Sequence, residues 1–458
     1  MLSRTKKAWT AIAFASFTML LLCSCEAKQT MNPLSSPKTY HGFFDQSIVH
    51  QIDVQISNTD LQKQRENPLE KKKYKVDVTI DSERIKNVAF STKGGSSLAI
   101  PTSSGSSRYP FKLNFGKYEK DQTYYGLDKL NLSNLYDDPS EMRDWLAYRI
   151  MEEAGVDAPL TSYVWLTVNG NDMGLYLAVE DIDESWLERT GHKESKLYKP
   201  EAKISDMNLK GANDAQIIQE KGLLAFFQNR IKQLGSPADT GAALVYVDDD
   251  AASYPDIFNN AKTKITDEDK TRMIHSLKAL NDPAQCQSVI DTEEVIRYFA
   301  AHNFGLSSDS YTGMSSHNYY LLEQNGILSI YPWDYNNSFG DTLSALHPEM
   351  SRDEVVNWAI DTPLFDVIPQ ERPIWTWITE KSEGLSRYHE IMDKLIAEYF
   401  ESGQFEKEID SICELIQPYQ EKDPTSFFDS EAMQAGCQNL KEFCVDRASS
   451  VRNQLDKK

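Results

Sequence analysis

Three polar residues between positions 309 and 334 have the types and the order that phosphoryl transfer requires. Asp309 precedes Asn318 by nine positions, and Asp334 follows sixteen positions later. A carboxylate can orient or deprotonate an acceptor hydroxyl, while an amide oxygen and a second carboxylate can hold Mg²⁺ on phosphate groups. The alternation in HNYYLLE and ILSIYPWD, with a turn at Asn325-Gly326, predicts a hairpin that would gather these residues at one end.

Each of these residues also has a purely structural interpretation. Asp309 could cap a turn, Asn318 could satisfy backbone groups, and Asp334 could begin an Asx-turn. Asp309 and Asp334 could instead form the carboxylate pair of a glycoside hydrolase, but that reaction would leave Lys112 and Asn318 without a role. The ordered set is therefore more informative than its members.

The N-terminal half predicts elements that could complete such a site. Strands are expected in YKVDVTID, NVAFST and YPFKLNF, a helix over 138–154, and a hairpin in TSYVWLTVNGNDMGLYLAVEDID. The small lobe of a protein kinase has a similar order, with a glycine-bearing turn and a strand lysine on the phosphates. Here the turn would be KGGSS, the lysine Lys112, and the hinge would lie near Glu180.

The C-terminal half is mostly helical by its periodicity from residue 266 onwards. Residues 201–260 form a polar insertion with one helix expected around 221–234. The sequence thus predicts an α+β protein with a two-lobed, kinase-like fold. We expect a β-rich N-lobe over 46–183 and a mainly helical C-lobe over 184–458.

Several ordered segments carry a resemblance to one family. They are KGGSS, PFKLNF, DPSEMRDWLAYRIMEEAGVDAP, VNGNDMGLYLAVEDID, KLYKP, DSYTGMSSHNYYL, YPWDYNNSFG and FCVDRASSVRNQL. Across nearly all of the mature sequence, the chain resembles the CotH kinase family of spore-coat and surface proteins. This resemblance implies an atypical protein kinase that uses ATP with Mg²⁺ or Mn²⁺ to phosphorylate Ser or Thr of surface or spore-coat proteins.

The resemblance also implies roles for individual residues. Asp309 resembles the catalytic acid, Asn318 and Asp334 resemble the metal-binding amide and acid, and Lys112 resembles the strand lysine that contacts phosphates. An ordinary kinase has four residues between its catalytic acid and its amide, whereas this chain has eight.

Further residues are expected around the nucleotide. Lys93 and Gly94 of the turn and Glu180 at the hinge are the remaining candidates, with Asp181 beside Glu180; a solvated strand end is the alternative for that pair. The helix should offer a polar partner for Lys112, and the candidates there are Glu141, Arg143 and Glu152.

The N-terminus predicts export and lipid anchoring. Basic MLSRTKK precedes an apolar run over 8–22 and then Cys25, in the pattern of a lipoprotein signal over 1–25. A tether over 26–45 would follow, and the lipidated Cys25 would hold the chain on the outer face of the membrane. A plain signal peptide or a short anchor helix is the alternative.

Charge and cysteine content narrow the possible partners. A formal charge of −21 argues against nucleic acid as a partner. The cysteines at 286, 413, 437 and 444 lack metal-site spacing and are expected to be buried thiols.

The alternative to an enzyme is a non-catalytic surface scaffold or adhesin that keeps a kinase-like fold.

Overall fold

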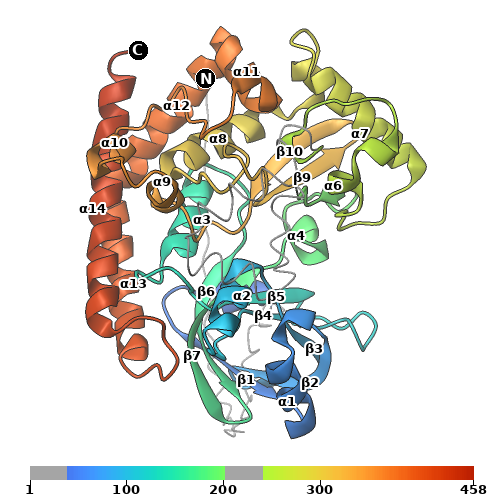
Figure 1. Ribbon diagram of the computed structural model, residues 1–458, viewed down its shortest axis with the longest axis vertical. Helices are drawn as coiled ribbons and strands as arrows, with labels where there is room; N and C mark the ends of the chain where they lie inside the picture. The colour runs from blue at the N-terminus through green and yellow to red at the C-terminus, as the bar shows by residue number, and fades with distance from the viewer. Residues whose placement is uncertain (1–38, 202–240) are drawn as a thin grey trace, which may run out of the picture. The chain divides into compact units, whose positions relative to one another are not determined.

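The computed structural model describes residues 39–201 and 241–458 (Figure 1). The expected signal over 1–25, the tether up to residue 38 and the helix expected around 221–234 lie outside the described residues. The rest of the expected tether is wrong, because Tyr40–Phe44 form a 3-10 helix with three buried aromatic side chains. No helix in the described ranges is long and apolar enough to cross a membrane.

Seven strands of the N-terminal half close into a barrel. They are β1 (His50–Gln55), β2 (Tyr74–Ile80), β3 (Glu83–Thr92), β4 (Phe111–Asn114), β5 (Lys129–Ser133), β6 (Thr161–Val168) and β7 (Asn171–Glu180). Their order around the barrel is β1-β2-β3-β4-β5-β7-β6, and parallel pairing of β1 with β6 closes it. Alternating apolar side chains, such as Ile52 and Val54 of β1, fill the interior.

Two barrel strands were not predicted from the sequence. β1, HQIDVQ, has only two aliphatic residues, and β5, KLNLS, has five residues and follows a polar loop. Short strands with few apolar positions have little periodicity of their own, and pairing with neighbours defines them. The simple order of three strands, one helix and two strands therefore becomes a closed barrel.

The segment around the glycine turn also differs from the prediction. β3 ends at Thr92, and Lys93–Gly95 lead directly into helix α2 (Ser96–Ser103). Lys112 follows on β4. Gly94 has a φ of 88°, and a Cβ there would lie 2.6 Å from Ser97 Oγ, so only glycine fits without rearrangement. The helix α1 (Asn58–Glu66) lies earlier, between β1 and β2.

Helix α3 (Arg143–Glu153) begins five residues after the predicted start at 138. Glu141 has a left-handed φ of 58°, and the Asp138 carboxylate accepts hydrogen bonds from the backbone N–H groups of Ser140 and Arg143. An aspartate that satisfies nearby backbone donors favours a turn over a helix. The helix itself is buried on most sides, which suits its position between the barrel and the helical part (Figure 1).

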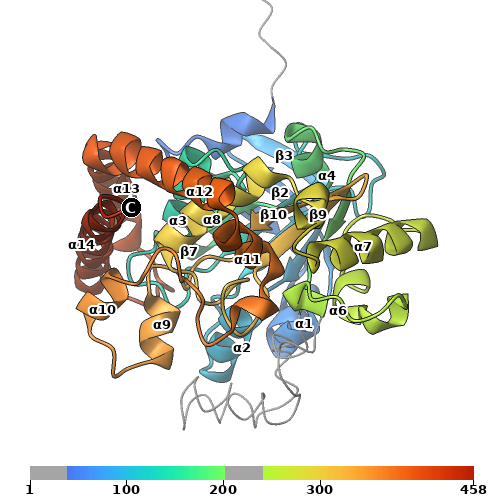
Figure 2. The same ribbon diagram turned by 90° about the horizontal axis from the view of Figure 1, so that it is seen from above.

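The C-terminal part combines a small sheet with helices. Strands β8 (Lys196–Tyr198), β9 (Tyr319–Gln324) and β10 (Ile327–Pro332) form an antiparallel sheet in the order β10-β9-β8. The helices are α4 (Glu184–Arg189), α6 (Pro255–Phe258), α7 (Asp267–Leu280), α8 (Thr292–Gly305), α9 (Asp341–Leu346), α10 (Arg352–Val356), α11 (Pro373–Glu380), α12 (Ser382–Leu395), α13 (Gln404–Gln420) and α14 (Ser430–Leu455). Helices α8, α11 and α12 lie together in both views (Figures 1 and 2).

Two hydrophobic cores result from this arrangement. One fills the barrel, and the other joins the outer side of the barrel to α3, α8, the β9–β10 hairpin and the C-terminal helices. The mixture of helices and strands confirms the α+β class. The two-lobed, kinase-like arrangement stays a prediction.

Candidate active site

The loop between α8 and β9 carries Asp309, and buried side chains contact it. Arg372, fully buried, donates to the carbonyl oxygens of Tyr311 and Gly313. His302 of α8 lies 2.7 Å from Thr312 Oγ1 through its Nε2 atom. Side chains from outside the loop therefore hold its backbone and Thr312 in place, as a functional loop requires.

The Asp309 carboxylate lies among polar side chains. Its Oδ1 atom accepts from Ser315 Oγ at 2.9 Å and lies 3.5 Å from His317 Nε2. Its Oδ2 atom accepts from the amide groups of Asn318, at 3.2 Å, and Asn337, at 3.3 Å. These four contacts set the orientation of the Asp309 carboxylate.

Asn318 and Asp334 lie at matching ends of the β9–β10 hairpin. The Trp333 N–H donates to the Asn318 carbonyl at 3.2 Å, which joins the two strand ends. Asn318 has a φ of 56° and Asp334 a φ of 58°. Left-handed backbone is tolerated by Asn and Asp and is often found at functional sites. The Asn318 amide nitrogen donates to Asp309, so its amide oxygen is the atom that can bind a cation.

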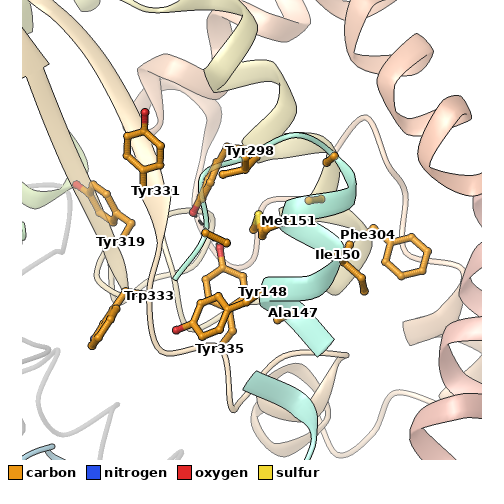
Figure 3. Close-up of a cluster of buried hydrophobic side chains, with 14 of the residues drawn as sticks. Ala147, Tyr148, Ile150, Met151, Tyr298, Phe304, Tyr319, Tyr331, Trp333 and Tyr335 are labelled. Atoms are coloured by element: carbon orange, nitrogen blue, oxygen red, sulfur yellow. Dashed lines mark hydrogen bonds between the residues drawn. The ribbon is translucent and has the colours of Figure 1, made fainter. Parts of the chain in front are cut away.

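Helix α3 positions the loop that follows β10 (Figure 3). The Asp334 N–H donates to Tyr148 Oη at 2.9 Å, and the Tyr335 N–H donates to Asp144 Oδ1 at 2.6 Å. Burial, and then the nearby Asp334 carboxylate, raises the pKa of Asp144 to about 7. Asp144 was not predicted, although its spacing of one helical turn from Tyr148 could have indicated a shared face.

Lys112 finds its partner on the barrel. Its Nζ atom donates to Asp181 Oδ2 at 2.5 Å, and Asn131 of β5 donates to Asp181 Oδ1 at 2.8 Å. Burial alone would raise the pKa of Asp181, but the Lys112 ammonium and these hydrogen bonds lower it to about 2. Asp181 thus holds the Lys112 side chain in a defined orientation.

The expected helix partner for Lys112 was wrong. Glu141 is buried elsewhere and accepts from Ser426 Oγ, Arg143 pairs with Asp341, and Glu152 pairs with Arg149. Because α3 begins at Arg143, Glu141 precedes the helix. The partner is supplied by the end of β7 instead.

Glu180 is also placed away from the cleft. Its fully buried carboxylate accepts from Arg189 Nη2 at 2.7 Å, from Tyr40 Oη at 2.9 Å and from the Leu160 N–H at 3.1 Å. Successive strand residues point to opposite faces, so Asp181 lines the cleft and Glu180 does not. The expectation that the Glu180 side chain binds cofactor is therefore not supported.

One cleft of about 330 Å³ brings most of the predicted residues together. Lys93, Gly94, Lys112, Asn318, Asp309 and Asp334 all line it. The Lys93 ammonium lies 5.4 Å from the centre of the Trp333 ring, and burial lowers its pKa despite the nearby Asp334. The volume falls within the range of small-molecule sites.

Two further lysines on the opposite wall were not predicted. Lys199 follows β8 and pairs with Glu201 at 2.8 Å, and Lys262 lies beside them. Burial, and then the neighbouring Lys199, lowers the pKa of Lys262. KLYKP, which contains Lys199, carries part of the resemblance and could have indicated this wall. Lysines converging on one cleft of an acidic chain favour an anionic ligand.

No group of three or more His, Cys, Asp or Glu side chains within 39–201 and 241–458 could hold a metal ion by itself. A cation at Asn318 and Asp334 would therefore share its ligands with water and phosphate oxygens. Mg²⁺ is commonly bound in this way, through one or two protein ligands and the phosphates of a substrate.

The comparisons with known proteins agree on one class. The family model described as CotH kinase protein matches residues 90–451, so this chain belongs to the CotH kinase family. Among curated proteins, it is similar to inner spore coat protein H of Bacillus subtilis (strain 168). The two are 22% identical over 337 residues, which cover 73% of this chain and 80% of that protein.

A second protein of the same organism is similar over a shorter stretch. The inner spore coat protein H-like protein of Bacillus subtilis (strain 168) is 41% identical over 61 residues, which cover 13% of this chain and 20% of that protein. The family that the ordered segments indicated is thereby confirmed.

Proposed function

We propose that this chain is an ATP- and metal-dependent protein kinase that phosphorylates Ser or Thr of a surface or spore-coat protein. One observation carries the proposal: Asp309, tied to Asn318, opens onto a lysine-lined cleft that also contains Asp334. Family membership supports it. A glycoside hydrolase would leave the lysines on both walls of the cleft without a role.

Asp309 acts on the acceptor in this proposal. Its carboxylate orients the acceptor hydroxyl and takes its proton as the phosphoryl group transfers. Ser315, Asn318 and Asn337 fix its direction. The proton therefore moves from the acceptor oxygen to a carboxylate oxygen of Asp309.

Asn318 and Asp334 would hold Mg²⁺ or Mn²⁺ through an amide oxygen and a carboxylate. The bound ion would neutralise charge on the phosphates of ATP. Lys112 and Lys93 lie on the barrel side of the cleft and Lys262 on the other side, so the chain can contact the phosphates from both walls. Asp181 keeps Lys112 in place.

We further propose that the chain is anchored at the cell surface through a lipid on Cys25. The motif in residues 1–25 and the spore-coat name of the relative support a surface or coat location. Cys25→Ala should release the protein from membrane fractions into the soluble fraction, as detected by immunoblot. Retention of the variant in the membrane fraction would refute the anchor.

The nucleotide site is tested by thermal stability of residues 28–458 with ATP and Mg²⁺ or Mn²⁺. At a ligand concentration of 100 times Kd, binding should stabilise the folded protein by about 2.7 kcal/mol. Asp334→Ala should abolish the metal-dependent shift. Asp446→Ala removes a half-exposed acid of α14 outside the cleft and serves as the control, which should shift like the wild type.

Transfer is measured separately, with ATP labelled on its γ-phosphate and spore-coat or surface proteins as acceptors. Incorporation of label that requires metal and Asp309 would support the enzyme. A metal-dependent stability shift without transfer to any acceptor, or to the chain itself, would favour a nucleotide-binding scaffold. Absence of both signals would reject the proposed function.

A further inference from the structure

Helices α13 and α14 form an antiparallel hairpin with a defined register. They lie side by side in both views (Figures 1 and 2). Next to the turn, Ser430 Oγ donates to Gln420 Oε1 at 2.7 Å. Further along, Lys441 Nζ lies 2.8 Å from Asp410 Oδ2. Residues equally far from the turn therefore face each other across the two helices.

This register places Cys413 opposite Cys437. Each cysteine lies seven residues beyond the facing Gln420–Ser430 pair, on its own helix. Seven residues are close to two turns, so both positions return to the facing side, about 10 Å further from the turn. Both cysteines are present as free thiols.

The surroundings of the two sulfur atoms differ. Cys437 is 6% exposed, and its thiol donates to the Ser140 carbonyl at 3.7 Å. Cys413 is partly exposed, and the neighbouring Cys437 thiol lowers its pKa. An accessible thiol with a lowered pKa next to a second cysteine can act as the attacking thiol, with its neighbour as the resolving one.

We propose that Cys413 and Cys437 are an oxidation site that forms an intrachain disulfide with a small-molecule or protein disulfide as the oxidant. The Cys413 thiolate attacks one sulfur of the oxidant, forming a mixed disulfide and releasing the other sulfur as a thiol. Cys437 then loses its proton, attacks the Cys413 sulfur and releases the second thiol. Two protein thiols are oxidised and one disulfide is reduced to two thiols.

The Cys413–Cys437 disulfide would link the two helices of the α13–α14 hairpin, which contacts both the barrel and the segment before α3. In the turn between α13 and α14, the buried Asp423 carboxylate pairs with Arg108 of the barrel part at 2.7 Å. It also accepts from the Leu175 N–H at 2.8 Å. Beside Cys437, a Cβ on Gly436 would lie 2.6 Å from the backbone of Pro139, so α14 packs tightly on that segment. Closing the loop between the cysteines should therefore stabilise the folded protein, because the bond restricts the unfolded chain.

The test is redox mapping of the full chain and does not depend on the proposed kinase activity. The folded protein is equilibrated with reduced and oxidised glutathione over a range of ratios, blocked with an alkylating reagent, digested and analysed by mass spectrometry. A linked peptide pair containing Cys413 and Cys437 should appear under oxidising conditions, with a higher Tm than the reduced protein. Cys286 and Cys444, which are 1% and 0% exposed, should stay reduced.

Two variants make the outcome specific. Cys437→Ser should trap glutathione on Cys413 as a stable mixed disulfide, because the resolving thiol is missing. Cys413→Ser should lose both the linked peptide and the glutathione adduct. Recovery of both cysteines as free thiols at every glutathione ratio in the folded wild type, or linkage of either to Cys286 or Cys444, would overturn the proposal.

Discussion

The side-chain amide of Asn318 donates to both the backbone carbonyl and the carboxylate of Asp309, at 2.9 and 3.2 Å. One residue thus sets the direction of the acid and, through its amide oxygen, is available to a cation. The eight residues between the two do not separate them, because the loop folds back and Ser315 within it also donates to the acid. A longer insertion than in ordinary kinases is therefore compatible with the same pairing.

Asp309→Asn should remove phosphoryl transfer and leave nucleotide binding intact. The asparagine oxygen can replace Oδ2 and accept from Asn318, and its NH2 group can donate to Ser315 Oγ, but the amide cannot take a proton. Loss of a general base lowers the rate by about 10²–10⁴-fold. Single-turnover transfer gives the rate, and the thermal shift with ATP and metal checks binding. Asp446→Asn is the control, and an unchanged rate in Asp309→Asn would contradict the assignment.

Position 318 allows the metal role to be separated from the backbone role. Asn318→Gly and Asn318→Ala should both lose the metal-dependent thermal shift, because each lacks the amide oxygen. Without ligand, the alanine variant should be less stable than the glycine variant by about 1 kcal/mol, because a φ of 56° is unfavourable for alanine and not for glycine. Urea unfolding of the two variants measures the difference.

The matched control for position 318 is an exposed helical site. Ala435 lies in α14, where right-handed backbone favours alanine, so Ala435→Gly should lose about 1 kcal/mol relative to wild type. The order of glycine and alanine should therefore reverse between the two positions. The same order at both would show that the left-handed backbone at 318 has no measurable effect.

The parts of the site that could be predicted are local in sequence. Asp309, Asn318 and Asp334 belong to one loop and one hairpin, so turn signals and strand alternation were enough to place them together. Lys112 was found because a strand and a family segment coincide. Asp144 and Lys262 are brought in by packing between distant elements; helical spacing indicates that Asp144 shares a face with Tyr148, but not what that face contacts.

Glu180 was predicted to face the nucleotide, but Asp181 lines the cleft instead. This error has a different physical cause. Every residue from Met173 to Glu180 is buried, so β7 shows no polar and apolar alternation that would tell its two faces apart. A shift of one residue moves a side chain to the opposite face of a strand. The end of the strand could therefore be predicted, but not which of two adjacent acids faces the cleft.

Lys262→Met should weaken ATP binding by about tenfold or more. A hydrogen bond to a charged group contributes about 1.5–3 kcal/mol, and 1.4 kcal/mol corresponds to a factor of ten in Kd. Isothermal titration with a non-hydrolysable ATP analogue and Mg²⁺ measures the constant. Lys278→Met removes a lysine that pairs with Asp249 outside the cleft and should leave Kd unchanged. Equal constants for Lys262→Met and wild type would remove this lysine from the site.

A pH-dependent gain in stability is expected for Glu294→Gln. Burial, and then the nearby Asp157 and Asp291, raises the pKa of Glu294 from 4.5 to about 8. Between these values the folded state holds a proton that the unfolded state has lost, so the wild type loses stability as pH rises. Glutamine removes this penalty. The variant should match the wild type near pH 4 and exceed it increasingly towards pH 8, by up to about 1.4 kcal/mol per pH unit.

The neighbouring Glu293 should behave in the opposite way and is the control for this measurement. A hydrogen bond from Arg387 is the main cause that lowers its pKa, so its ionised form stabilises the folded state above the unfolded value of 4.5. Glu293→Gln should therefore be less stable than wild type at pH 7, and the deficit should shrink as pH falls below 4.5 through the lowered pKa. Urea unfolding of both variants from about pH 3 to pH 8 distinguishes the two. A Glu294→Gln curve parallel to the wild type would show that this buried carboxyl titrates normally.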